Sequence, residues 1–223
     1  MAFKDKRNPW YDKEITERDP GPAVWPVEAV PAWLNIYARA YLQSRGINQT
    51  ESEFYDLHFC ESGYWANRVL IPVYSISGQL MCFQGRSITD NGRQKYITSG
   101  RRNVYMPFDL RCARDVCDTL IVMEGPLDVI AAGRAQVLAC AMLGIHPTEY
   151  QINQLIGMAK DFSLTSLLVW FDTGAVDSAM ELQLKLNPFI PTGIVIQPDG
   201  FKDPGSTPAA IIKQTLKEYV SGS

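Results

Sequence analysis

Side chains that bind soft metal ions are scarce in this chain of 223 residues. It has two histidines, His58 and His146, and five cysteines that form no Cys-x-x-Cys pair. A structural zinc site takes four thiolate or imidazole ligands, usually spaced in close pairs, so we do not expect zinc. An odd number of scattered cysteines favours reduced thiols in a cytosolic protein over a disulfide framework.

Long apolar runs are also missing. No stretch reaches the length of a membrane-spanning helix, so we expect no membrane partner. The start of the chain, Met1 to Arg7, is polar and has no apolar signal-peptide core behind it. Hydrophobic residues still make up 46% of the chain, which is enough to bury one large core or two small ones. The composition therefore predicts a globular protein.

The formal net charge of −3 hides an uneven distribution. Between Ser62 and Arg114, eight Lys or Arg stand against two Asp, a net charge of +6, whereas from Thr119 onward ten acidic residues stand against six basic ones, a net charge of −4. A basic segment suits phosphate backbones. Aromatic residues within it can stack exposed bases, unless they pack in the core; they are Tyr64, Trp65, Phe83, Tyr96 and Tyr105.

The most informative stretch is the apolar run 119–123 followed by Glu124-Gly125-Pro126-Leu127-Asp128. The run predicts a buried strand. Pro126 suits the first turn of a helix, which we expect to continue to about residue 135. Glu124 would then lie at the carboxyl end of a strand and Asp128 in the first helical turn. Open α/β sheets bind their ligands at that edge.

The same pattern recurs twice downstream. The apolar run 166–171 ends at Asp172, and the run 192–197 is soon followed by Asp203. Carboxylates on a rigid sheet edge suit Mg²⁺, and a pair of such ions supports phosphoryl or nucleotidyl transfer. Aspartates at strand ends also serve as helix caps. The recurrence after three strands nevertheless favours a metal site.

Periodicity divides the chain into four parts. Residues 1–27 are expected to form an extended arm and residues 206–223 an amphipathic C-terminal helix. Residues 28–117 predict a basic α+β part, with a helix over 27–44, short strands and an Asn91-Gly92 hairpin turn. Residues 118–205 alternate strands and helices, which implies parallel strands joined by crossovers. The predicted fold class is α/β.

Several motifs, spread in order over residues 37–205, resemble those of the Toprim domains and, within these, of the bacterial DnaG-type primases. The acidic positions match the Toprim pattern. Five further segments are similar to primase motifs: Tyr41 to Gly46 to YLxxRG, Asn67 to Pro72 to NRxxxP, Gly78 to Arg86 to GxxxxFxGR, Lys95 to Ser99 to KYxNS, and Leu143 to Thr148 to LGTxLT.

The resemblance implies a primase catalytic core, in which residues 28–117 form the basic α+β lobe and residues 118–205 the Toprim lobe. Such a DNA-directed RNA polymerase makes short RNA primers on single-stranded DNA from ribonucleoside triphosphates, using one or two Mg²⁺ or Mn²⁺ ions. Glu124 and Asp172 would be catalytic and would hold metal together with Asp203 and Asp128. Arg86, Lys95 and Tyr96 would hold the incoming nucleotide.

Contacts to nucleic acid are expected from four arginines of the basic lobe: Arg45, Arg68, Arg101 and Arg102. Full-length primases also carry an N-terminal zinc-binding module and a C-terminal segment that docks on the replicative helicase, and this chain has neither. We therefore expect a lone catalytic domain, or one whose helicase and zinc-binding subunit are separate polypeptides. Such compact or split primases suit a phage or mobile element, in the cytoplasm of a bacterial cell or of a phage-infected host.

Two departures from the family pattern bear on catalysis. Asp-x-Asp is expected after the third Toprim strand, but the chain has Asp172-Thr173-Gly174; Asp-Pro-Asp is expected later, but it has Asp203-Pro204-Gly205. Each missing carboxylate weakens Mg²⁺ binding, unless Asp177 or Asp199 compensates or the site holds one ion. The alternatives are a catalytically impaired Toprim protein that binds single-stranded DNA or a replication partner, and a Toprim nuclease, which the primase motifs disfavour.

Overall fold

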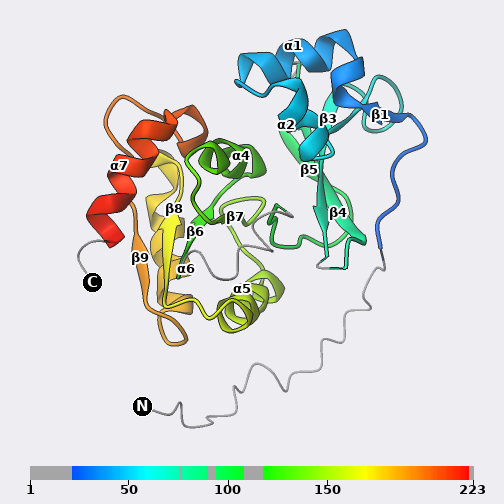
Figure 1. The fold of residues 1–223 in the computed structure, drawn as a ribbon. Helices are drawn as coiled ribbons and strands as arrows, with labels where there is room; N and C mark the ends of the chain where they lie inside the picture. Colours follow the sequence, from blue (N-terminus) through cyan, green and yellow to red (C-terminus); the bar gives the residue numbers. More distant parts are fainter. Residues whose placement is uncertain (1–21, 76, 90–93, 108–117, 221–223) are drawn as a thin grey trace.

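The computed structural model describes residues 22–75, 77–89, 94–107 and 118–220. Two sheets lie side by side, and helices flank the second of them (Figure 1). The mixture of helices and strands confirms the predicted α/β class. The Asn91-Gly92 turn, most of the N-terminal arm and the three arginines at 93, 111 and 114 lie outside the described residues.

The first sheet is antiparallel, with its strands in the order β1-β2-β3-β4-β5. Its members are β1 (Ala29–Pro31), β2 (His58–Cys60), β3 (Arg68–Tyr74), β4 (Leu80–Ser87) and β5 (Tyr96–Thr98). Gly78, at φ +82°, occupies the tight turn between β3 and β4, where its amide donates to the Ser75 carbonyl. Strands β2 to β5 follow the β-rich pattern of the sequence closely.

The helical prediction for residues 27–44 is wrong in its first part. That stretch begins as β1 and continues as a 3-10 turn, η1 (Ala32–Leu34); the helix α1 (Ile36–Ser44) starts only after Asn35. The Asn35 side chain accepts from the amides of Tyr37 and Ala38, so it caps α1 at that point. A second short helix, α2 (Gln49–Phe54), was not predicted.

The second sheet is parallel, with its strands in the order β7-β6-β8-β9. They are β6 (Thr119–Met123), β7 (Ala139–Ala141), β8 (Ser166–Trp170) and β9 (Thr192–Ile194). The connections contain α4 (Pro126–Arg134), α5 (Glu149–Asp161), α6 (Val176–Leu186) and two 3-10 turns, η2 (Thr173–Ala175) and η3 (Pro204–Ser206); α7 (Ala209–Val220) follows.

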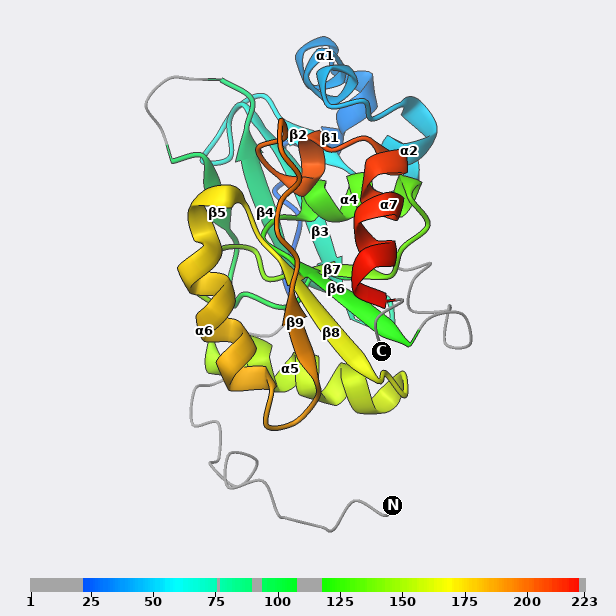
Figure 2. The same ribbon diagram turned by 90° about the vertical axis from the view of Figure 1, so that its left-hand side faces the viewer.

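Helices cover both faces of the second sheet (Figure 2). The side chains of β6 alternate accordingly, because Ile121 and Met123 pack toward α4 and α7 whereas Leu120 and Val122 pack toward α5 and α6. This explains why every residue of β6 is buried. None of the described helices combines the length and apolar character needed to cross a bilayer.

One hydrophobic core joins the two sheets. It contains Leu42 of α1 and Ile71 of β3 together with Met123 of β6 and Ile130 of α4. Tyr105 adds a backbone link, since it exchanges hydrogen bonds of 2.8 and 2.9 Å with Ala141 of β7. The first sheet and its helices are therefore packed against the second sheet.

Candidate active site

A cavity of about 390 Å³ lies where the carboxyl ends of β6 and β8 face the first sheet. Both acidic and basic side chains line it. The acidic ones are Glu124, Asp128, Asp172 and Asp203; the basic ones are Arg45, Arg86, Lys95, Arg134 and Lys202. The four carboxylates lie together at this sheet edge, as the strand pattern predicted.

The turn after β7 holds the strand end that carries Glu124. The Gly144 amide donates to the Glu124 carbonyl at 3.1 Å, and the Gln84 side chain of β4 donates to the Leu143 carbonyl at 3.3 Å. Leu143 and Gly144 have φ values of +56° and +140°, a conformation that glycine adopts without strain at the second position. The Leu-Gly pair thus fastens the acidic edge to the first sheet.

Burial and neighbouring charges raise the pKa values of both Glu124 and Asp172. Burial, and then the charges of Asp172 and Asp203, raise the pKa of Glu124, while Lys95 opposes the rise. Burial and Asp203 likewise raise the pKa of Asp172, against Lys95 and Lys202. Carboxylates whose pKa values are raised by burial and by neighbouring carboxylates are expected where a cation is to be bound.

Asp172 has a carboxylate oxygen that is ready for a ligand. Its Oδ1 atom is buried and has no hydrogen-bond partner among the described residues. A buried unpaired carboxylate oxygen is costly, and binding a divalent cation would remove that cost. Asp172 makes no side-chain cap to η2, so the capping explanation does not account for it.

The carboxylate oxygens of Asp203 and Asp128 accept hydrogen bonds from backbone amides. Asp203 Oδ1 accepts from the Ser206 amide at 2.7 Å and caps η3. Asp128 Oδ2 accepts from Gly125 at 3.1 Å, and Asp128 Oδ1 accepts from Gly205 at 3.0 Å. Burial, and then Asp172 and Asp203, raise the pKa of Asp128 to about 8. Asp128 therefore ties the segment that carries Asp203 to the start of α4.

Among the described residues, no three His, Cys, Asp or Glu side chains are close enough to form a ready cage for an ion. Mg²⁺ commonly uses one or two protein carboxylates and keeps several waters, so Glu124 and the unpaired oxygen of Asp172 fit it without such a cage. The all-oxygen donor set also suits a hard cation better than zinc.

Gly174 and Gly205, the two glycines that replace carboxylates of the family pattern, have different surroundings. A Cβ atom at Gly174 would have no described heavy atom within 4 Å, whereas one at Gly205 would lie 2.5 Å from Asp128 Oδ1. Glycine is therefore required at 205 for the approach of Asp128, but not at 174. Asp177 and Asp199, the two candidates for compensation, are both exposed and lie outside the set of described residues that line the cavity.

The basic side of the cavity contains a cluster around Tyr96. The Arg86 guanidinium carbon lies 4.8 Å from the centre of the Tyr96 ring, and Lys95 Nζ lies 5.8 Å from it. Arg86 Nε and Nη1 are buried without a hydrogen-bond partner among the described residues. Unpaired guanidinium donors that face a cavity are suited to bind an anion such as a phosphate.

The four arginines predicted to contact nucleic acid have different surroundings. Arg45 is exposed and lines the cavity. Arg101 and Arg102 are half-buried: the guanidinium of Arg101 lies 3.7 Å from the centre of the Tyr150 ring, and Arg102 donates to the His146 carbonyl at 3.0 Å.

Arg68 is inside the protein, 2% exposed. Its guanidinium donates to the carbonyls of Gly85 at 3.0 Å and Gln94 at 2.7 Å, with a longer contact to Lys95 at 3.4 Å. In this position it fixes the segment that presents Lys95 and Tyr96 to the cavity. A direct contact with nucleic acid would require it to leave these acceptors.

Sequence reasoning missed two basic residues of the cavity, Lys202 and Arg134. Lys202 was detectable, because it directly precedes Asp203. Arg134 gave no distinct signal, since a basic residue in the last turn of a helix is the ordinary complement of the helix dipole.

No family model matches the chain. Two curated DNA primases are similar in sequence: that of Mycoplasma genitalium is 23% identical over 66% of this chain and 24% of its own length, and that of Haemophilus influenzae is 25% identical over 70% and 28%. The chain thus spans about a quarter of the length of the curated relatives it matches.

Solved structures share the fold. A DnaG primase catalytic domain bound to single-stranded DNA has a TM-score of 0.69 at 18% identity, covering 84% of this chain and 74% of that one. The Aquifex aeolicus primase, with zinc-binding and RNA polymerase domains, has a TM-score of 0.70 at 21% identity, covering 86% and 57%. The RNA polymerase domain of Mycobacterium tuberculosis DnaG has a TM-score of 0.66 at 18% identity, covering 83% and 77%. The resemblance found in the sequence is confirmed: this chain has the α/β fold of the catalytic core of DnaG-type primases.

Proposed function

We propose that this chain joins ribonucleotides into short RNA primers on a single-stranded DNA template, as a metal-dependent nucleotidyltransferase. One observation carries the proposal: the unpaired carboxylate oxygen of Asp172 and the unpaired donors of Arg86 belong to the same cavity. A nucleoside triphosphate with its divalent cation needs such a combination, because the cation seeks carboxylates and the phosphates seek guanidinium donors. Similarity to DNA primases in sequence and fold supports it.

Two carboxylates, Glu124 and Asp172, would be the main ligands of the cation, Mg²⁺ or Mn²⁺, and the charge of Asp203 nearby would add to its attraction. When bound, such an ion neutralises phosphate charge and lowers the pKa of a coordinated hydroxyl. Asp128 would position Asp203 through the Gly205 amide instead of binding metal, because both of its oxygens accept hydrogen bonds. Asp177 would not bind the cation, since its side chain is exposed and does not line the cavity.

The reaction would form a bond between the primer 3′-oxygen and the α-phosphorus of the incoming nucleotide, and break the bond to pyrophosphate. Glu124 would accept the hydroxyl proton as a general base. Arg86 and Lys95 would bind the triphosphate, and the Tyr96 ring, 4.8 Å from the guanidinium carbon, would support Arg86. Arg45, exposed at the same cavity, would contact the template backbone.

The decisive experiment is primer synthesis with labelled ATP and GTP, single-stranded DNA and Mg²⁺ or Mn²⁺, with products resolved by length. The wild type should make short RNA, and Asp172→Asn should remove at least nine-tenths of it while leaving DNA binding intact. Asp161→Asn, the same chemical change at an exposed residue outside the cavity lining, serves as the control. Products that persist in Asp172→Asn and in Glu124→Gln would refute the site.

A second candidate is a binding module without catalysis. Two observations favour it: Gly174 and Gly205 replace carboxylates of the family pattern, and the described residues form no three-carboxylate cage. Single-stranded DNA binding without any primer synthesis, in both Mg²⁺ and Mn²⁺, would be its signature. A replicative helicase and a separate zinc-binding subunit remain predictions from the resemblance.

A further inference from the structure

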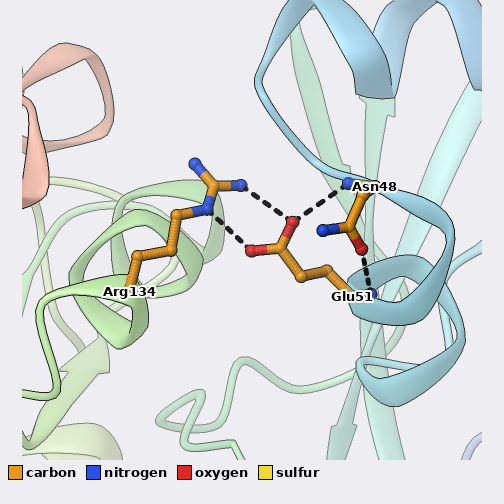
Figure 3. Close-up of polar contacts among 3 residues, drawn as sticks. All are labelled: Asn48, Glu51 and Arg134. Atoms are coloured by element: carbon orange, nitrogen blue, oxygen red, sulfur yellow. Dashed lines mark hydrogen bonds and ion pairs between the residues drawn. The ribbon is translucent and has the colours of Figure 1, made fainter.

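An ion pair between Glu51 and Arg134 joins α2 to α4 (Figure 3). Arg134, the last residue of α4, donates from Nε to Glu51 Oε1 at 2.7 Å and from Nη2 to Glu51 Oε2 at 3.3 Å. The two residues are 83 positions apart in the chain. Of the two, Arg134 also lines the cavity.

The pair is built into a wider network. Glu51 Oε2 accepts from the Asn48 amide at 3.0 Å, and Asn48 Oδ1 accepts from the Glu51 amide at 2.9 Å, so both residues also form the capping box of α2. Burial raises the pKa of Glu51, but the hydrogen bonds from Arg134 and Asn48 outweigh it, and the pKa lies below its usual value. A bidentate pair fixed by a cap loses less side-chain entropy than an isolated surface pair.

A second contact brings the same two helices together. A Cβ atom at Gly133 would lie 2.8 Å from the Tyr55 hydroxyl, so the Tyr55 side chain rests on the end of α4 next to Arg134. Tyr55 also packs against the shared core. The α2 segment is therefore docked on α4 at two neighbouring points.

Arg45 lies at the end of α1, just before the docked α2 segment. Arg134 Nη1 would lie 3.3 Å from a Cβ atom at Gly46, so the guanidinium covers the turn between α1 and α2. Arg45 directly precedes that turn and faces the cavity as an exposed side chain. Asp128 lies in the first turn of α4, six residues before Arg134 or about 9 Å along the helix, beside the acidic edge.

We infer that Asn48, Glu51 and Arg134 form a clamp that positions Arg45 opposite the acidic edge of the cavity for single-stranded DNA. The three are positioning residues, since they act through Arg45. The inference rests on the proposed function, because it takes single-stranded DNA as the ligand of Arg45.

The sign of one substitution separates this inference from its main competitor. If Arg134 contacts DNA directly, Glu51→Gln frees its guanidinium and removes a negative charge, so binding should tighten. If Arg134 acts by positioning, Glu51→Gln should weaken binding despite the more positive net charge. We expect Glu51→Gln and Arg134→Gln each to raise the Kd for a fluorescent oligonucleotide by roughly two- to fivefold, the range that corresponds to an exposed ion pair.

Two comparisons make the test specific. Arg39→Gln removes the same charge as Arg134→Gln, but Arg39 lies on α1 outside the cavity lining, so it measures the effect of net charge alone. In an Arg45→Gln background, the effects of Glu51→Gln and Arg134→Gln should both disappear, since the residue that they position is gone. Circular dichroism of each variant checks that it is folded.

Amide hydrogen exchange gives a measurement that does not depend on DNA. The amides of Gly46 and Ile47 donate to the carbonyls of Gln43 and Leu42 at 2.9 Å. Both should exchange at least threefold faster in Glu51→Gln and Arg134→Gln than in the wild type.

Three results would each overturn the inference: DNA binding that is tighter or unchanged in Glu51→Gln, an effect of that substitution that persists in the Arg45→Gln background, or unchanged amide exchange. If the wild type still makes primers, the proposed function stands. Failure of the proposed function would show instead in the wild type, as absence of both DNA binding and primers. In that case DNA is not the ligand of Arg45. The amide exchange rates of Gly46 and Ile47 then show whether the clamp still stabilises the turn between α1 and α2.

Discussion

Replacing Gly174 with aspartate would restore the Asp-x-Asp pattern at a position that has room for it. No described heavy atom lies within 4 Å of a Cβ atom built there, and the residue is exposed. The free energy of unfolding should therefore change by no more than about 0.5 kcal/mol, as for an ordinary surface substitution. For a general separation of about 8 Å, Coulomb's law gives an attraction between a carboxylate and a divalent ion on the order of 1 kcal/mol in a water-like dielectric, or about fivefold in affinity.

The same substitution at Gly205 is the matched opposite. Its Cβ atom would lie 2.5 Å from Asp128 Oδ1, and the Gly205 amide now donates to that oxygen at 3.0 Å. Gly205→Asp must break this hydrogen bond and place two carboxylates side by side. We expect it to destabilise the protein by about 1–3 kcal/mol and to weaken metal binding.

Isothermal titration with Mn²⁺ and Mg²⁺, urea denaturation and the primer assay measure these effects together. Gly174→Asp should bind Mg²⁺ about fivefold more tightly than the wild type and make more primer, whereas Gly205→Asp should do neither. Gly174→Ala controls for the backbone change. Equal behaviour of the two aspartate variants, or no gain with Gly174→Asp together with loss of synthesis in Asp177→Ala, would refute the reasoning.

Three further predictions concern pH, the buried arginine and salt. Burial raises the pKa of Asp128 from 3.8 to about 8, so the folded state keeps a proton that the unfolded chain has lost; metal-free stability should fall between about pH 4 and pH 8, by up to about 1.4 kcal/mol per pH unit, and Asp128→Asn should flatten that slope in urea denaturation. Arg68→Lys should lower the free energy of unfolding by on the order of 3 kcal/mol and impair nucleotide incorporation through Lys95; a change confined to DNA binding would contradict the buried position. Replacing Arg101 and Arg102 together with alanine should reduce the slope of log K against log salt by up to about two contacts' worth, and an unchanged slope would show that their ring and carbonyl contacts are their whole role.

Local patterns in the sequence were sufficient for the strands and helices around the acidic edge. The run 119–123, the helix from Pro126 and the strand before Asp172 all appear as predicted, because apolar periodicity and the fixed φ of proline act over a few residues. The helix expected from residue 27 failed because Asn35 caps the chain later. The strand expected to reach residue 197 ends at Ile194, since the Ile196 amide donates to the Tyr219 hydroxyl of α7.

The sequence alone determined which carboxylates follow which strands, and it identified the family that the chain resembles. Tertiary structure decided what each side chain is free to do. Asp128 is engaged by the amide of Gly205, 77 residues away, and Arg68 is enclosed by carbonyls up to 27 residues away. Arg134 meets Glu51 across 83 residues. Such partners are brought together by the packing of two sheets around one core, which no local pattern encodes, so the positions of the site residues were predictable and their availability was not.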